Sequence, residues 1–171
     1  KGFEKDKIQA AKWFLAAAEQ GVVDAAHAYA VSVASGVLGA HKRHESLKWY
    51  TRAADGGHTR AMTDLGSMYL NGELVEKNDE AALSLFIRAA EAGSFCGAKK
   101  AAVRFVFGQG AKKDLEKALQ WANTAKEIAT EKNNKEDLAE ANTLIETTLS
   151  EISRQKTSTP QTFDGSQLLG A

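Results

Sequence analysis

The sequence predicts an all-α protein: a right-handed α-α superhelix (solenoid) of 36-residue helical hairpins, closed by a C-terminal capping helix. The first observation is a repeat, because Trp13, Trp49, Leu85 and Trp121 follow one another at intervals of 36 residues. The second is that apolar residues recur at helical spacing twice within each interval. A repeat of this length that holds two short helices is typical of a solenoid, in which each hairpin covers its neighbour.

Small residues follow the same interval. Alanines recur at 17, 53, 89 and 125, and glycines recur at 21, 57 and 93 and again at 36, 72 and 108. Glycine is expected where a helix ends, because it can adopt the left-handed conformation found at that point without a steric penalty. In the first helices, Ala30, Gly66 and Ala102 share one position, where small side chains allow helices to approach closely.

The helices can be placed in order along the chain. A second helix ends at Gly21, and the next unit has its first helix over 25–35 and its second over 47–57. In the third unit the first helix ends at Gly72 and the second at Gly93. Helices of about 13 residues are marginal in water, so the hairpins must stack and bury each other's apolar faces. The recurring aromatic residues, Trp13 and Trp49 among them, are expected to fill the space between neighbouring hairpins.

The last unit departs from the repeat. A first helix begins near Cys96, and Ala129 then stands where the interval predicts glycine, so the second helix is expected to run to about Lys132. Asn133 and Asn134 are expected to make the turn that follows it.

A final helix is predicted from Lys135 to about Arg154. One face of it carries Leu138, Ala141, Ile145, Leu149 and Ile152. We interpret it as a capping helix, which closes the last apolar face of the array. The alternative is that this face is a dimerisation surface.

The segment "AMTDLGSMYLNGELVEKNDEAALSLFIRAAEAG", from Ala61 to Gly93, resembles the Sel1-like repeat, a relative of the tetratricopeptide repeat. The family pattern is similar to A-x-x-x-L-G-x-x-Y-x-x-G-x-x-V, a loop, then K-A-x-x-W-Y-x-x-A-A-x-x-G, and the match spans about Gln9 to Ala129. The tetratricopeptide repeat itself fits less well, because its period is about 34 residues and it places proline at the hairpin end. The only proline in this chain is Pro160. Tyr29-Ala30 stands in place of the Leu-Gly pair, so that unit is degenerate.

The resemblance divides the chain into three parts. Residues 1–132 are expected to hold Sel1-like repeats, with a partial first unit followed by three more. Residues 133–154 are expected to form the capping helix, and residues 155–171 a tail. Lys1 to Lys7 resemble the loop before a second helix, so the chain is expected to start inside a repeat and to be a mature product or part of a longer protein.

Composition limits the function classes. Twenty-two basic side chains balance twenty-two acidic ones, so no overall charge attracts nucleic acid or an anionic membrane. No apolar run approaches the roughly 20 residues that span a bilayer, and no signal peptide is present in this sequence. Membrane insertion is therefore not expected, and both the periplasm and the cytoplasm remain open. The single cysteine, Cys96, cannot form an internal disulfide.

Binding is expected on the concave surface lined by the first helices. If Ala61, Leu65 and Tyr69 face the core, then the residues between them face outward, and the interval gives their equivalents in the neighbouring units. The predicted partner-binding residues are His27, Val31, Arg60, Thr63, Asp64, Ser67, Asn71, Lys99, Lys100, Val103, Arg104 and Phe107. In related repeats an asparagine before the Leu-Gly pair often holds a ligand's backbone. Ala28, Asp64 and Lys100 occupy that position here, so such a clamp cannot be carried over. A purely structural alternative is that Asp64 and Lys100 pair with each other.

Other reactive side chains give weaker signals. His41 and His44 could hold a metal, but no third ligand is evident, so a solvated loop is the preferred interpretation. Cys96 is interpreted as a packed small residue rather than a reactive thiol, and His58 as a neighbour of a helix cap rather than a base. No phosphate loop, nucleophile elbow or zinc signature is present. We therefore predict no catalytic residues, no cofactor and no enzyme activity.

The tail contains three apolar residues, Phe163, Leu168 and Leu169. We expect it to dock on a solenoid surface, in its own chain or a neighbouring one.

Two function classes follow. The resemblance to Sel1-like repeats, often found in bacterial adaptors, implies a protein-protein interaction scaffold that binds a peptide segment or partner protein on its concave surface. The alternative is a cell-wall or small-molecule binding protein, with weak hydrolase activity as claimed for a cysteine-rich branch of similar repeats. The paired cysteines of that branch are absent from this sequence.

Overall fold

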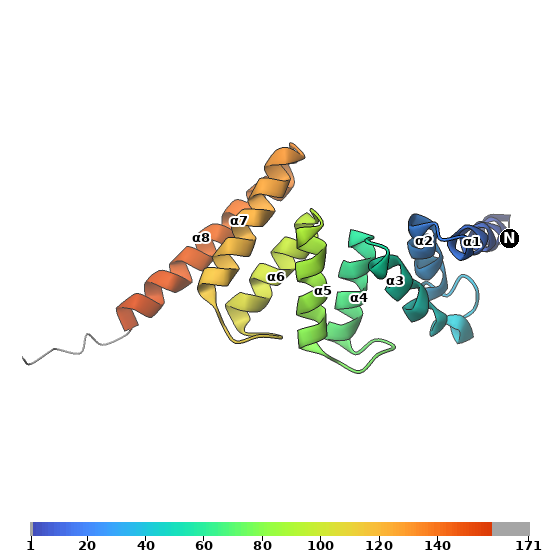
Figure 1. The fold of residues 1–171 in the computed structure, drawn as a ribbon, viewed down its shortest axis with the longest axis horizontal. Helices are drawn as coiled ribbons and strands as arrows, with labels where there is room; N and C mark the ends of the chain where they lie inside the picture. Colours follow the sequence, from blue (N-terminus) through green and yellow to red (C-terminus); the bar gives the residue numbers. More distant parts are fainter. Residues whose placement is uncertain (1, 159–171) are drawn as a thin grey trace, which may run out of the picture.

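The computed structural model describes residues 2–158, with side chains for residues 6–157. This part of the chain forms eight α-helices and one short 3-10 helix. Their bounds are α1 Gly2–Glu19, α2 Val23–Ala34, η1 Ala40–Lys42, α3 Glu45–Asp55, α4 Thr59–Asn71, α5 Asp79–Glu91, α6 Phe95–Phe107, α7 Leu115–Glu131 and α8 Lys135–Ser158. The helices follow one another in a row, with α7 and α8 side by side at the C-terminal end (Figure 1).

Nearly all contact between helices joins neighbours in the sequence, from α1 on α2 to α7 on α8. Helices one unit apart touch only slightly, as α4 and α6 do. This arrangement confirms the predicted all-α solenoid, because each hairpin is covered by the next rather than by a central core.

The predicted small-residue positions lie at the helix contacts. Ala53, Ala89 and Ala125 are fully buried, as are Ala30 and Ala102 in the first helices. At Gly66 the contact is closer still, because a Cβ atom there would lie 2.6 Å from the buried ring of Phe86. Glycine therefore sets the approach of α4 to α5.

The helix ends also repeat. His58 and Ser94, 36 residues apart, accept a hydrogen bond from the third backbone N–H beyond them, and so do Asn78 and Asp114. Val22, the equivalent of His58 in the unit before, makes no such bond. These side chains fix where each helix begins.

The predicted stops of the later helices are confirmed. Gly72 and Gly108 end α4 and α6 in the left-handed conformation. After α7, Lys132 is the C-cap and Asn133 has a φ of 50°, while the Asn134 side chain accepts hydrogen bonds from the N–H groups of residues 136 and 137.

Three local expectations are wrong. Residues 2–7 are helical rather than a loop, since good helix formers such as Glu4, Lys5 and Lys7 continue α1 toward its start without a proline. Trp13 is 68% exposed, whereas its equivalent Trp49 is buried. The difference arises because Trp49 packs edge-on against Tyr29 of α2, the first helix of its own hairpin, whereas no described helix precedes α1 to cover Trp13.

The third concerns the face of α8. Leu149 is 45% exposed, and the buried side chain beside it is Thr148, whose hydroxyl donates to the Leu144 carbonyl. That internal bond lets a threonine replace an apolar residue at the contact. The helix also runs to Ser158, past the predicted end near Arg154. The predicted tail residues Phe163, Leu168 and Leu169 lie outside the described residues.

Candidate functional site

A groove of about 710 Å³ lies between α2 and α4. We call it the α2–α4 groove. Six of the twelve predicted binding residues line it: His27, Val31, Arg60, Asp64, Ser67 and Asn71. Because successive first helices present these side chains one repeat apart, two adjacent hairpins are needed to form the groove.

The groove also contains residues that the outward-face prediction missed. Phe14 and Tyr50 enter from the second helices, while Arg43, Glu73 and Leu74 come from the segments that follow the first helices. Phe14 and Tyr50 are themselves 36 residues apart, so the repeat contained a signal for this pair. The loop residues had no such signal.

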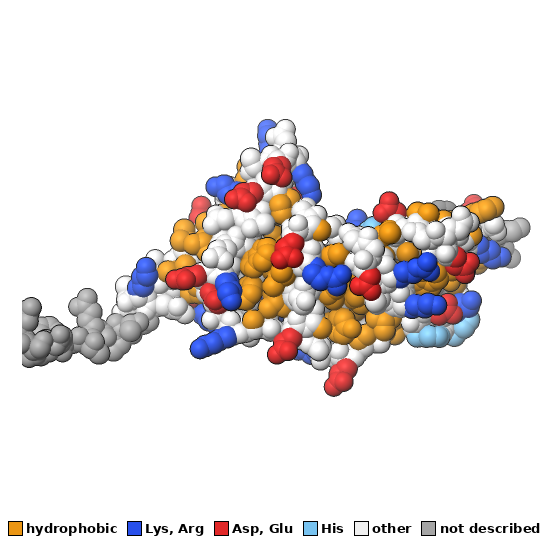
Figure 2. All heavy atoms as spheres, in the orientation of Figure 1, with side chains coloured by type: hydrophobic (Ala, Val, Ile, Leu, Met, Phe, Trp, Pro, Cys, Tyr) orange, Lys and Arg blue, Asp and Glu red, His pale blue; other side chains and the backbone are white. Residues whose placement is uncertain are grey.

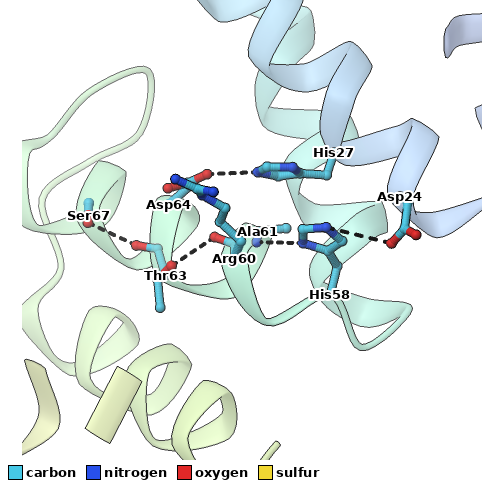
Figure 3. A network of polar contacts seen from close by, with 8 residues as sticks. All are labelled: Asp24, His27, His58, Arg60, Ala61, Thr63, Asp64 and Ser67. Atoms are coloured by element: carbon cyan, nitrogen blue, oxygen red, sulfur yellow. Dashed lines mark hydrogen bonds and ion pairs between the residues drawn. The ribbon is translucent and has the colours of Figure 1, made fainter. Parts of the chain in front are cut away.

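A hydrogen bond joins the two helices that form the walls. His27 Nε2 lies 2.9 Å from Asp64 Oδ2 (Figure 3). The His27 side chain is 13% exposed and that of Asp64 is 39% exposed. Because a carboxylate only accepts hydrogen bonds, His27 Nε2 carries the proton. The alternative in which Asp64 pairs with Lys100 is not found, since the Asp64 carboxylate bonds to His27 and the Lys100 ammonium lies over the Phe86 ring.

His58 extends this network. Its ring stacks on His27 with centroids 4.2 Å apart, and its Nδ1 accepts the Ala61 N–H at 3.0 Å. The proton of the neutral ring is then on Nε2, which lies 3.7 Å from an Asp24 carboxylate oxygen (Figure 3). His58 is therefore the helix cap itself rather than a neighbour of one.

Burial changes two pKa values in this region. Burial lowers the pKa of His58, and the nearby His27 ring lowers it further, against the opposing effect of Asp24. Burial, with Asp64 and Glu73 nearby, raises the pKa of Tyr50 to about 12. Tyr50 is thus an uncharged phenol in the groove at neutral pH.

Apolar and basic groups are both open to solvent in the groove. Phe14, Val31 and Leu74 are 38%, 43% and 44% exposed. The Arg43 side chain is held by a 2.9 Å bond from its Nε to the Ala34 carbonyl, and Arg60 is exposed without an ion pair among the described residues. The groove therefore offers contacts to an apolar group and to an anionic one.

A smaller hollow of about 390 Å³ lies between α4 and α6. Arg60, Asp64 and Ser67 line this hollow as well as the α2–α4 groove, so α4 separates the two. Thr63 and Lys100 also line the hollow. Thr63 is only 6% exposed, and its hydroxyl donates to the Arg60 carbonyl. Cys96 is exposed there, so its interpretation as a packed residue is wrong.

The remaining predicted residues lie elsewhere. Lys99 pairs with Glu140 of α8, and Arg104 donates to the Gln109 side chain. Val103 and Phe107 face a separate groove beside α8. The predicted binding residues therefore do not form one continuous surface. Those of α6 lie apart from the α2–α4 groove, because α8 packs against α6.

The face of the molecule drawn in Figure 2 carries no patch of a single charge. Acidic and basic side chains are interspersed over the face seen in Figure 2. Among the described residues no group of three His, Cys, Asp or Glu side chains could hold a metal, including the segment with His41 and His44. No helix in the described part of the chain is long and apolar enough to cross a membrane.

Comparison with known proteins gives one family. A Sel1 repeat model matches residues 1–22, 24–58, 59–94 and 100–127. No curated protein matches the chain in sequence.

Solved structures resemble the fold. A Sel1 repeat protein from Oxalobacter formigenes aligns with a TM-score of 0.62 at 25% identity, over 74% of this chain and 54% of its own. The protective antigen c5321 of uropathogenic Escherichia coli, described as displaying an SLR fold, aligns at 0.62 and 24%, over 90% of this chain and 36% of its own. Cysteine-rich protein B of Helicobacter pylori aligns with a TM-score of 0.59 at 18% identity, over 80% of this chain and 95% of its own. The chain thus spans about half of the Oxalobacter protein and about a third of the E. coli antigen.

Proposed function

The chain belongs to the Sel1 repeat family, and from that premise we propose that it is a non-catalytic interaction scaffold for a partner protein. Its binding site is the α2–α4 groove, which takes a peptide segment of the partner. The observation that carries the proposal is the groove itself, in which exposed apolar side chains lie beside polar groups that are already held in place.

The size of the groove suits a short segment. Its volume of about 710 Å³ is enough for a few side chains, and concave surfaces between repeats are the usual binding sites of solenoids. Exposed Phe14, Val31 and Leu74 would be covered by an apolar side chain of the segment. Covering such surface is favourable by about 25 cal/mol per Å².

Preorganised polar groups support binding without large rearrangement. The bond between His27 and Asp64 fixes the two walls relative to each other, and Arg43 is tied to the end of α2. Groups that are already ordered lose little conformational entropy when a ligand arrives.

The charges indicate the chemistry of the segment. Asp64 is engaged by His27, whereas the Arg60 guanidinium lies exposed on the wall that faces both hollows. A carboxylate of the ligand can accept two hydrogen bonds from such a guanidinium. We therefore propose an apolar peptide segment with an adjacent acidic group.

Selection from a random peptide library tests this proposal. Peptides enriched on the full chain would be titrated calorimetrically against wild type, Arg60→Glu, Val31→Asp and the control Lys126→Glu. The Lys126 side chain is exposed on α7 and does not line the α2–α4 groove. We expect at least about tenfold weaker binding for the two groove variants, a loss of about 1.4 kcal/mol, and no change for the control.

The same titrations separate the alternative class. One contrary result is a muropeptide that binds wild type but not Val31→Asp, while no selected peptide shows this loss of binding. That result would favour a cell-wall binding protein over a peptide-binding scaffold. Peptides that bind all four proteins equally would place recognition outside this groove.

A further inference from the structure

A second groove, of about 560 Å³, lies between the C-terminal parts of α6 and α8. We call it the α6–α8 groove. Val103, Val106 and Phe107 line one wall, and Leu144, Thr147 and Thr148 line the other. Phe107 is 68% exposed, the same fraction as Trp13 and more than any other large apolar side chain in the described residues.

The polar groups of the α8 wall are already partnered within the helix. The hydroxyls of Thr147 and Thr148 donate to the Leu144 carbonyl, and Arg154 pairs with Glu151 at 2.9 Å. The α8 wall therefore presents mainly carbon surface, and Lys113, from the loop after α6, adds a basic group to the groove that has no ion pair among the described residues. An apolar segment with little charge, and that charge negative, is the occupant that fits.

We propose that residues 159–171 of the same chain occupy the α6–α8 groove. This segment contains Phe163, Leu168 and Leu169 as its large apolar side chains, and Asp164 is its one charged side chain. It follows α8 directly, since α8 ends at Ser158. The apolar residues would cover Phe107, and Asp164 would lie near Lys113.

The chain is long enough to reach. From Ser158 back to Leu144 is 14 residues along α8, or about 21 Å at 1.5 Å per residue. Leu168 lies ten residues beyond Ser158, and ten extended residues span up to about 33 Å. The difference leaves room for the reversal of direction, which Pro160 and Gly165 favour because both residues are common in turns.

This inference is independent of the peptide site in the α2–α4 groove. The two grooves share no lining residue. Failure of one proposal therefore leaves the other standing.

Thiol labelling of the full chain tests the docking. In a Cys96→Ser background, Thr147→Cys places one reactive group in the groove, and its second-order rate with N-ethylmaleimide is measured. The rate is measured again with Phe163, Leu168 and Leu169 all changed to serine. We expect the triple serine variant to be labelled about tenfold faster. This factor corresponds to a docked form that holds about nine-tenths of the molecules and protects residue 147 from the reagent. Equal rates would overturn the proposal.

A matched control uses Thr124→Cys on α7. Thr124 is a partly exposed helical threonine whose hydroxyl bonds back to the helix, as that of Thr147 does, but it lies outside the groove. Its labelling rate should not respond to the tail substitutions. The protection at residue 147 should also be the same after hundredfold dilution. Loss of protection on dilution would mean that the tail of a second copy fills the groove, and would contradict docking within one chain.

Discussion

His27 Nε2 and Asp64 Oδ2 lie 2.9 Å apart and join α2 of one hairpin to α4 of the next. The bond spans the boundary between repeats, where the α2–α4 groove is formed. In a solenoid the stability of the array depends on such boundaries, because each hairpin contacts only its neighbours. The residues around this boundary therefore affect both stability and binding.

The stacked histidines predict a loss of stability in mild acid. The pKa of His58 is lowered in the folded state, so the unfolded state binds the proton more readily. Stability should be complete above the unfolded pKa, about 6.5, and should fall as the pH decreases below it. Protonation would also remove the Nδ1 acceptor that caps α4.

His58→Asn provides the comparison for this effect. Asparagine is a good N-cap and does not titrate in this range. Urea unfolding at pH 7.5 and 5.5 should show a smaller loss of stability in the variant than in wild type. An equal loss would assign the pH dependence to other groups.

Gly66→Ala should destabilise the protein, although alanine is the better helix former. The new Cβ would lie 2.6 Å from a carbon of the Phe86 ring, and that ring is fully buried. Overpacking of this kind costs about 1 to 3 kcal/mol, more than the roughly 1 kcal/mol that alanine contributes to the helix. Chemical denaturation gives the free energy of unfolding.

A double variant identifies the clash as the cause. In a Phe86→Leu background the ring is gone, so adding Gly66→Ala should cost much less than it does in wild type. A cost that is the same in both backgrounds would show that the ring is not responsible.

Val22→Ser should stabilise the protein. Val22 occupies the cap position that His58 and Ser94 occupy in the next units, yet it offers no acceptor and is 49% exposed. A serine there can accept an N–H of the first turn of α2, which is worth about 1 kcal/mol. The reverse change, Ser94→Ala, should lose a similar amount. A thermal melt of each variant compares them, and an unchanged midpoint for Val22→Ser would contradict the cap equivalence.

The two equivalent tryptophans should differ in their contributions. Trp49→Ala should lower the free energy of unfolding by about 3 to 5 kcal/mol, because the buried ring packs against Tyr29 of the first helix of its own hairpin. Trp13→Ala should change it by about 0.5 kcal/mol or less, because 68% of that side chain is exposed. Urea unfolding of both variants measures the difference. Equal losses would show that Trp13 is covered in solution.

The repeat interval predicted the fold because the packing of a residue in an internal hairpin depends on its position within the 36-residue repeat. Ala53, Ala89 and Ala125 are buried for the same reason, and each can be found from the others. The repeat interval did not predict the exposure of Trp13, since its equivalent Trp49 is buried against the first helix of its own hairpin and no described helix precedes α1. A terminal unit therefore escapes the rule that governs internal ones.

The groove was harder to predict. His27, Arg60 and Asp64 were found as outward residues of the first helices, but their pairing was not, because it depends on side-chain reach across a boundary. Arg43 and Leu74 lie in segments between helices, and Leu74 has a φ of 62° that no residue pattern indicated. Such segments differ from one unit to the next, so the interval carries no information about them.

The most direct test of the account is a nuclear magnetic resonance titration. The full chain, labelled with ¹⁵N, is titrated with a library-selected peptide that contains an apolar side chain next to a carboxylate, and the perturbed amides are mapped. We predict that they cluster on α2 and α4, around Val31, Arg60 and Asp64. Perturbations confined to α7 and α8, with α2 and α4 unchanged, would contradict the α2–α4 groove as the binding site.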